Sequence, residues 1–166
     1  MDTIIFDRRE MNRDSTLCQS FVRQAKEALS HHPQIKHEWS INAKDGRCIL
    51  DIPKEYDSGF PITVQVRLKE IIIIAGRAHT NLDLDVNPDE LAAHALGFVR
   101  DLLSPAMRIR ERLAGGKPYK WIFELYQDGK WIAEEECCLF FWNYIGKRTE
   151  KIYQNRILSA RENPVE

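Results

Sequence analysis

The chain of 166 residues carries 24 Lys and Arg against 25 Asp and Glu, which gives a formal net charge of −1 at pH 7. Its apolar share of 43% and charged share of 30% are typical of a globular protein and exclude a disordered or membrane-embedded chain. Because the charges nearly cancel, nothing attracts the chain as a whole to nucleic acid or to an anionic membrane. Only a local basic patch would bind either.

The organisation expected from this length is a single domain, residues 1–166, with residues 1–13 and 146–166 as peripheral segments. The first residues, MDTIIFDRREMNRD, lack the basic region and apolar core of a signal peptide. The longest purely apolar run, Ile71–Ala75, is too short to cross a bilayer. We therefore expect a cytoplasmic protein, whose oligomeric state the sequence leaves open.

The N-terminal part of the chain predicts a helix followed by a hairpin. Apolar residues recur every three or four positions between Asp14 and Pro33, which indicates an amphipathic helix with Asp14 or Ser15 as N-cap and Pro33 as its end. Two short strand-like runs, 36–42 and 47–53, then flank Asp45-Gly46. That dipeptide supplies the positive φ angles of a tight turn, so the runs form a hairpin.

Three further strands are expected before the next helix. Residues 62–69 alternate between apolar and polar side chains, as in a strand with one solvated face. Residues 71–75 are continuously apolar, which predicts a central strand covered on both faces. Residues 77–86 alternate again and place polar side chains on one side.

The helix that follows has the clearest start in the chain, with Asn87 as N-cap and Pro88 at the first helical position. Ser104-Pro105 either kinks this helix or begins a second helix that reaches the sequence AGG at 114–116 and carries Arg108, Arg110 and Arg112. A second hairpin turns around Asp128-Gly129, and the tail after Gly146 is basic and weakly helical.

These elements predict an α+β fold with a single antiparallel, possibly mixed, sheet of about five or six strands and helices packed on one face. The helices should cover the side that bears Val64, Leu82 and Trp121. The other side then carries Gln65, Arg67, Arg77, His79 and Asn81, which together with Asp83 we call the polar ladder. Such a set could bind an anion or perform acid–base chemistry, and it could equally be a solvated sheet face.

The stretch WIAEEECCLFFWNY, residues 131–144, sets glutamates against apolar residues. Strict alternation places Glu135 on the same side as Trp131 and Leu139. Three arrangements resolve this conflict: a β-bulge that resets the phase, an exposed half of a long hairpin, or a buried carboxylate paired with an arginine. A buried acid would have a displaced pKa and would be a functional candidate.

Neither a metal nor another cofactor is expected. Cys137 and Cys138 point to opposite faces of a strand, which is unsuitable for a shared zinc ion. The remaining cysteines, Cys18 and Cys48, form no C-x-x-C pair, so all four are expected to be reduced. No glycine-rich phosphate loop or linear hydrolase motif is present in the sequence.

The function expected from these features is recognition of a protein partner, in an immunity, chaperone or adaptor role, through the polar ladder and Glu135. One alternative is an enzyme that uses His79 with Arg77 or a glutamate of residues 134–136, and clustering of His79, Arg67 and Glu135 in one pocket would favour it. A second alternative is nucleic-acid binding by the tail, whose basic and aromatic residues are Lys147, Arg148, Lys151, Arg156, Arg161, Tyr144 and Tyr153.

Overall fold

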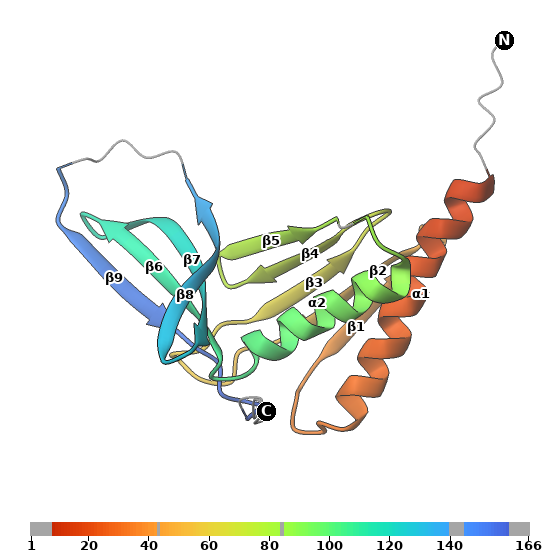
Figure 1. Ribbon diagram of the computed structural model, residues 1–166, viewed down its shortest axis with the longest axis horizontal. Coiled ribbons are helices and arrows are strands. Elements are labelled where there is room, and N and C mark those ends of the chain that lie inside the picture. Colours follow the sequence, from red (N-terminus) through yellow and green to blue (C-terminus); the bar gives the residue numbers. More distant parts are fainter. Residues whose placement is uncertain (1–7, 43, 84, 140–144, 160–166) are drawn as a thin grey trace, which may run out of the picture. The chain divides into compact units, whose positions relative to one another are not determined.

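The structure is a computed structural model that describes residues 8–42, 44–83, 85–139 and 145–159, and side chains of the first helix from Leu17 onward. Within these residues the chain forms two helices and nine strands (Figure 1). The helices are α1 (Arg8–Ser30) and α2 (Pro88–Leu102). The strands are β1 (Glu38–Asn42), β2 (Arg47–Ile52), β3 (Ile62–Val66), β4 (Ile71–Ala75), β5 (Ala78–Leu82), β6 (Met107–Ala114), β7 (Lys117–Gln127), β8 (Lys130–Cys138) and β9 (Arg148–Tyr153).

The α+β class is confirmed, but the strands form two antiparallel sheets instead of the single sheet predicted. One sheet has the order β1-β2-β3-β4-β5, and the other has the order β8-β7-β6-β9. Trp121 lies on β7, so the predicted common buried face of Val64 and Trp121 is divided between the two sheets. No helix in the described residues is long and apolar enough to span a membrane.

The chain also divides into two compact units, which we describe separately. Unit 1 comprises residues 1–52, 63–73 and 81–96, and unit 2 comprises residues 53–62, 74–80 and 97–166.

In unit 1, the amphipathic faces of the helices cover strands that alternate between buried and less buried positions. Val64 and Val66 are fully buried, whereas Gln65 between them is half-buried. Phe21 of α1 is completely buried and packs edge to face against Trp39 of β1, with 6.2 Å between the ring centroids. Residues 71–75 form the interior strand β4, in which buried positions alternate with half-buried ones, so one face is covered more completely than the other.

The helix boundaries follow local rules with one exception. Asn87 caps α2 as predicted, because its Oδ1 accepts a hydrogen bond from the Glu90 backbone N–H at 2.9 Å. The N-cap predicted at Asp14 or Ser15 is wrong, since α1 already begins at Arg8. Arg23 of α1 donates to Asp89 at 2.8 Å. Hydrogen bonds from Ser20 and from Arg23 hold the pKa of Asp89 below its ordinary value.

In unit 2, the segment after Pro105 is a strand, so the second helix predicted for Arg108, Arg110 and Arg112 is wrong. Ser104 ends the helical path, because its Oγ donates to the Asp101 carbonyl and accepts from the Ala106 N–H. Beyond that turn, buried and half-buried positions alternate along β6 with a period of two. The tail is likewise a strand instead of a weak helix, because β9 pairs with β6.

The C-terminal hairpin turns at Asp128 and Gly129, which have φ angles of 52° and 77°, as the sequence predicts. The pairing of β7 with β8 shifts register, because Phe123 pairs with Glu135 while the next residue of β7, Glu124, pairs with Ala133. Glu134 is therefore the extra residue of a β-bulge. This confirms the bulge among the three arrangements considered, and Glu135 is half-buried instead of fully buried. Phe140 to Tyr144, also part of that stretch, lie outside the described residues.

Candidate ligand-binding site

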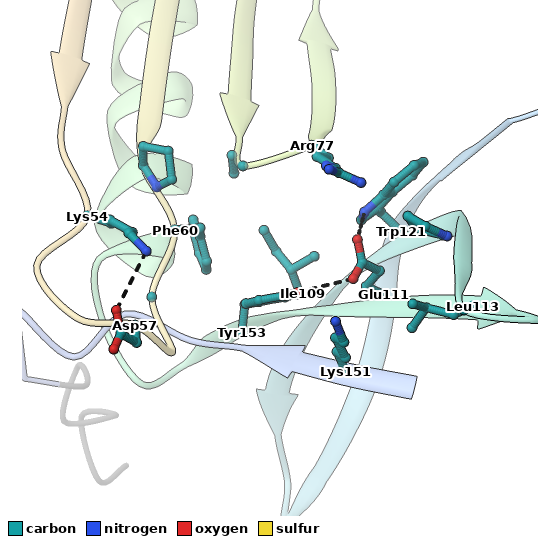
Figure 2. Close-up of a pocket in the computed structure, with 16 residues that line it drawn as sticks. Lys54, Asp57, Phe60, Arg77, Ile109, Glu111, Leu113, Trp121, Lys151 and Tyr153 are labelled. Atoms are coloured by element: carbon teal, nitrogen blue, oxygen red, sulfur yellow. Dashed lines mark hydrogen bonds and ion pairs between the residues drawn. The ribbon is translucent and has the colours of Figure 1, made fainter. Parts of the chain in front are cut away.

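A cavity of about 640 Å³ lies within unit 2 (Figure 2). Its walls come from the loop before β3, from the turn between β4 and β5, and from β6, β7 and β9. The lining includes apolar and aromatic side chains together with a few charged groups. Cavities of about 300–1,000 Å³ with this composition are the usual size for small-molecule sites.

Glu111 is the buried charged group in the cavity wall, with an exposed fraction of 5%. Trp121 of β7 donates from Nε1 to Oε1 of Glu111 at 2.9 Å, and Tyr153 of β9 donates from its hydroxyl to Oε2 at 3.1 Å. Glu111 lies on β6, the strand between β7 and β9, so three adjacent strands hold the carboxylate in one orientation. Two fixed donors offset part of the cost of burying it.

The phenol of Tyr153 has a pKa above its ordinary value, because it is partly buried and because it donates to the Glu111 carboxylate. Arg77 opposes this effect through its positive charge. The balance keeps Tyr153 protonated at neutral pH, so the hydroxyl remains a donor to Glu111.

Three cationic side chains also line the cavity. Lys54 lies 3.9 Å from Asp57, another lining residue, and the other two are Arg77 from the turn after β4 and Lys151 from β9. Lys151 lies opposite Glu111 in the pairing of β6 with β9. Figure 2 shows Arg77 and Lys151 approaching Glu111 from different sides. Within the described part of the chain, no carboxylate lies at ion-pair distance from either cation.

The loop that bears Phe60 is held against the end of β9 by Asn155, whose exposed fraction is 1%. The Oδ1 of Asn155 accepts from the Phe60 N–H at 3.1 Å, and its Nδ2 donates to the Phe60 carbonyl at 3.2 Å. Gly59 permits this approach, because a Cβ there would lie 2.6 Å from Asn155 Oδ1. The aromatic wall formed by Phe60 is therefore fixed before any ligand arrives.

Of the predicted site residues, Arg77 lines this cavity. His79 and Glu135 also belong to unit 2, and His79 Nδ1 lies 3.4 Å from Cys137 Sγ, but neither His79 nor Glu135 is among the described lining residues. The remaining predicted residues, Gln65, Arg67 and Asn81, belong to unit 1.

The predicted polar ladder is not continuous, because β4 lies between the strand of Gln65 and the strand of Asn81. Arg67 instead donates to Gln65 at 3.2 Å and lies 3.9 Å from Glu70. Clustering of His79, Arg67 and Glu135 in one pocket would favour an enzyme, but none of the three is among the described residues that line the cavity.

None of Glu111, Trp121 and Tyr153 was predicted to line a cavity: Trp121 was expected in the core and Tyr153 in the basic tail. One sequence pattern could have identified Glu111. Glu111 stands between Ile109 and Leu113 in the apolar phase of a strand, which is the same conflict that drew attention to Glu135. Because this segment was predicted to be helical, the alternation expected of a strand was not applied to it.

The opposite face of the same sheet carries a charged ladder, which we define as Arg108, Arg110, Arg112, Glu124 and Glu150. Glu124 binds Arg108 Nε at 2.6 Å and Arg110 at 2.7 Å, and its side chain is 8% exposed. Glu150 binds Arg110 and Arg112, each at 3.1 Å. These arginines thus pair with Glu124 and Glu150 instead of with the glutamates of β8.

Two basic side chains of the tail contact other side chains of the protein, and a third lines the cavity. Arg148 lies over the ring of Tyr119 at 5.1 Å, Arg156 donates to Gln154, and Lys151 lines the cavity. Arg161 and Tyr144, which the nucleic-acid hypothesis also used, lie outside the described residues.

All four cysteines are free. Burial and a hydrogen bond with Cys18 raise the pKa of the Cys48 thiol far above its ordinary value, whereas Cys138 is exposed on β8. In the described part of the chain, no three side chains of the His, Cys, Asp and Glu types are grouped to hold a metal ion.

Comparison with protein-family models, with curated proteins and with solved structures finds no match for this chain. Function must therefore be inferred from the cavity and its side chains. A buried carboxylate and two cations without an ion-pair partner among the described residues line one cavity and can hold charged groups of a ligand, and the aromatic side chains can cover its apolar part.

Proposed function

We propose that this chain is a binding protein and that the cavity of unit 2 binds a small organic carboxylate. The supporting observation is the presence of Arg77 and Lys151 on the cavity with no carboxylate at ion-pair distance in the described residues. Arginine presents a planar fork that matches a carboxylate, and lysine adds a second positive charge.

The size and rigidity of the cavity support a small ligand over a flat protein partner. About 640 Å³ accommodates a compact organic molecule. Phe60 and Trp121 offer apolar walls, and both are held by hydrogen bonds, through the Phe60 backbone and the Trp121 indole. A wall that is already ordered loses little conformational entropy on binding.

The test follows the indole N–H resonance of Trp121 by NMR during titration with butyrate, because this group donates to Glu111 inside the cavity. We expect the resonance to move for the wild type and for Arg67→Ala, which removes a cation of unit 1. Arg77→Ala and Lys151→Ala should each weaken butyrate binding by about tenfold or more, since a hydrogen bond to a charged group contributes about 1.5–3 kcal/mol. Unchanged binding by Arg77→Ala would refute the proposal.

A protein partner is the second candidate function. It is favoured by the exposed apolar side chains of Tyr126, Ile132 and Leu139, whose exposed fractions are 51%, 43% and 59%. Two of these lie on or just beyond β8, which is an edge strand of its sheet and can accept an added strand from another chain. Ile132→Lys should abolish capture of a partner from native lysate, while leaving the response of Trp121 to butyrate unchanged.

A further inference from the structure

We propose that the ligand is a zwitterion, with its carboxylate at Arg77 and Lys151 and its protonated amine at Glu111. This inference rests on the proposed function and names the chemical class of its ligand. The sheet of β6 to β9 contains two acids that are almost equally buried. Glu111 and Glu124 have exposed fractions of 5% and 6%, and they lie on opposite faces of that sheet.

The chain neutralises one of these acids and not the other. Glu124 receives two arginines at 2.6 and 2.7 Å. Glu111 receives only the neutral donors Trp121 and Tyr153, and within the described residues no Lys, Arg or His lies at ion-pair distance from it. Buried charges in proteins are normally paired with an opposite charge. We therefore infer that a positively charged group of the ligand pairs with Glu111.

The hydrogen bonds of Glu111 leave room for that cation. An ionised carboxylate has about four acceptor positions, and Trp121 and Tyr153 occupy one on each oxygen. Because Glu111 lines the cavity, the remaining positions can accept hydrogen bonds from an ammonium group that enters it. The two neutral donors orient the carboxylate without cancelling its charge.

The opposite charges of the cavity are close enough to serve one small molecule and yet are not paired with each other. Lys151 faces Glu111 across adjacent strands, and Arg77 lines the same cavity as both of them (Figure 2). No ion pair joins Glu111 to either cation in the described residues. A ligand with an amine at one end and a carboxylate at the other can therefore bridge the two charged regions.

The experiment compares 4-aminobutyrate and 6-aminohexanoate with their carboxylate-only and amine-only analogues, which are butyrate, hexanoate, butylamine and hexylamine. The readout is the Trp121 indole resonance. At least one amino acid should bind about tenfold more tightly than its carboxylate-only analogue, because the amine adds a charged hydrogen bond at Glu111. Both amines should bind more weakly than that amino acid.

Glu111→Gln is the decisive variant, because it keeps the shape of the side chain and removes its charge. The amino acid should then bind no more tightly than its carboxylate-only analogue, while the carboxylate itself binds as well as before or better. If Glu111→Gln does not fold, Glu111→Asp replaces it, since retracting the charge by one methylene should also reduce the preference. A preference that survives in the folded variant would overturn the role of Glu111.

The two proposals fail in different ways. If butyrate and hexanoate bind through Arg77 but neither amino acid binds more tightly than its analogue, the zwitterion is wrong and the carboxylate site stands. If none of the carboxylates binds, or if binding does not depend on Arg77, the carboxylate site itself is wrong.

Discussion

The buried ion pairs of Glu124 make the sharpest prediction about stability. Glu124→Gln keeps the size of the side chain and removes the charge that Arg108 and Arg110 share. Arg110 already has one buried nitrogen, Nε, without a hydrogen-bond partner in the described structure. In the variant, two partly buried guanidinium groups would therefore lose the negative charge that now offsets the cost of burying them.

The magnitude follows from the surroundings of each partner. Removing one member of a buried ion pair costs about 3–5 kcal/mol. Here the arginine side chains are 18% and 25% exposed, and Arg110 keeps Glu150 at 3.1 Å. Water and the second acid compensate part of the loss, so we expect a decrease in the free energy of unfolding at the lower end, about 3 kcal/mol.

The assay is urea unfolding followed by tryptophan fluorescence, in which Trp121 and Trp131 report on unit 2. Glu136→Gln is the matched control, because Glu136 pairs with Lys120 on the same sheet but its side chain is 47% exposed. That exposed pair should contribute less than about 1 kcal/mol. Equal effects of the two variants would refute the reasoning that burial makes the Glu124 pairs important.

Three other predictions concern separate parts of the chain. Cys137 and Cys138 should react with a thiol reagent in the native protein, whereas all 4 cysteines should react after unfolding, which thiol titration measures. Gly59→Ala should lower the free energy of unfolding by about 1–3 kcal/mol, because its Cβ would meet Asn155 at 2.6 Å, and urea unfolding checks this. The raised pKa of Tyr153 means that its contribution to stability is complete below its ordinary value of 10.0 and is lost as pH rises through the folded pKa. Tyr153→Phe should therefore lose less stability than the wild type between neutral and strongly alkaline pH, as shown by melting temperatures.

Local rules predicted the elements whose signals lie close together in the sequence. Asn87 and Pro88 define the start of α2, and Asp128 with Gly129 defines the last hairpin. These signals work because capping and turn geometry depend on a few neighbouring residues. The β-bulge was foreseen as one of three alternatives, but only the pairing of β7 with β8 decides among them.

Features that depend on partners distant in the sequence were not predictable. The segment of β6 was assigned to a helix because it follows one. Its alternation of buried and half-buried positions arises only because it pairs with β7 and β9. The polar ladder combines residues of β3 and β5, and β4 separates these two strands. Strand order is decided by the packing of whole strands, so the residues next to Gln65 or Asn81 in the sequence do not predict it.

Three glutamates stand among apolar residues of strands in unit 2, and each has a different physical outcome. Glu135 is only half-buried, because a bulge relieves the phase conflict. Glu124 is buried and paired with two arginines, which makes it structural. Glu111 is buried, oriented by two neutral donors and open to a cavity, and in the described residues it has no cationic partner. An acid in an apolar phase is therefore a useful sequence signal, but its meaning depends on which group supplies the opposite charge, and at Glu111 the group we propose is the ligand.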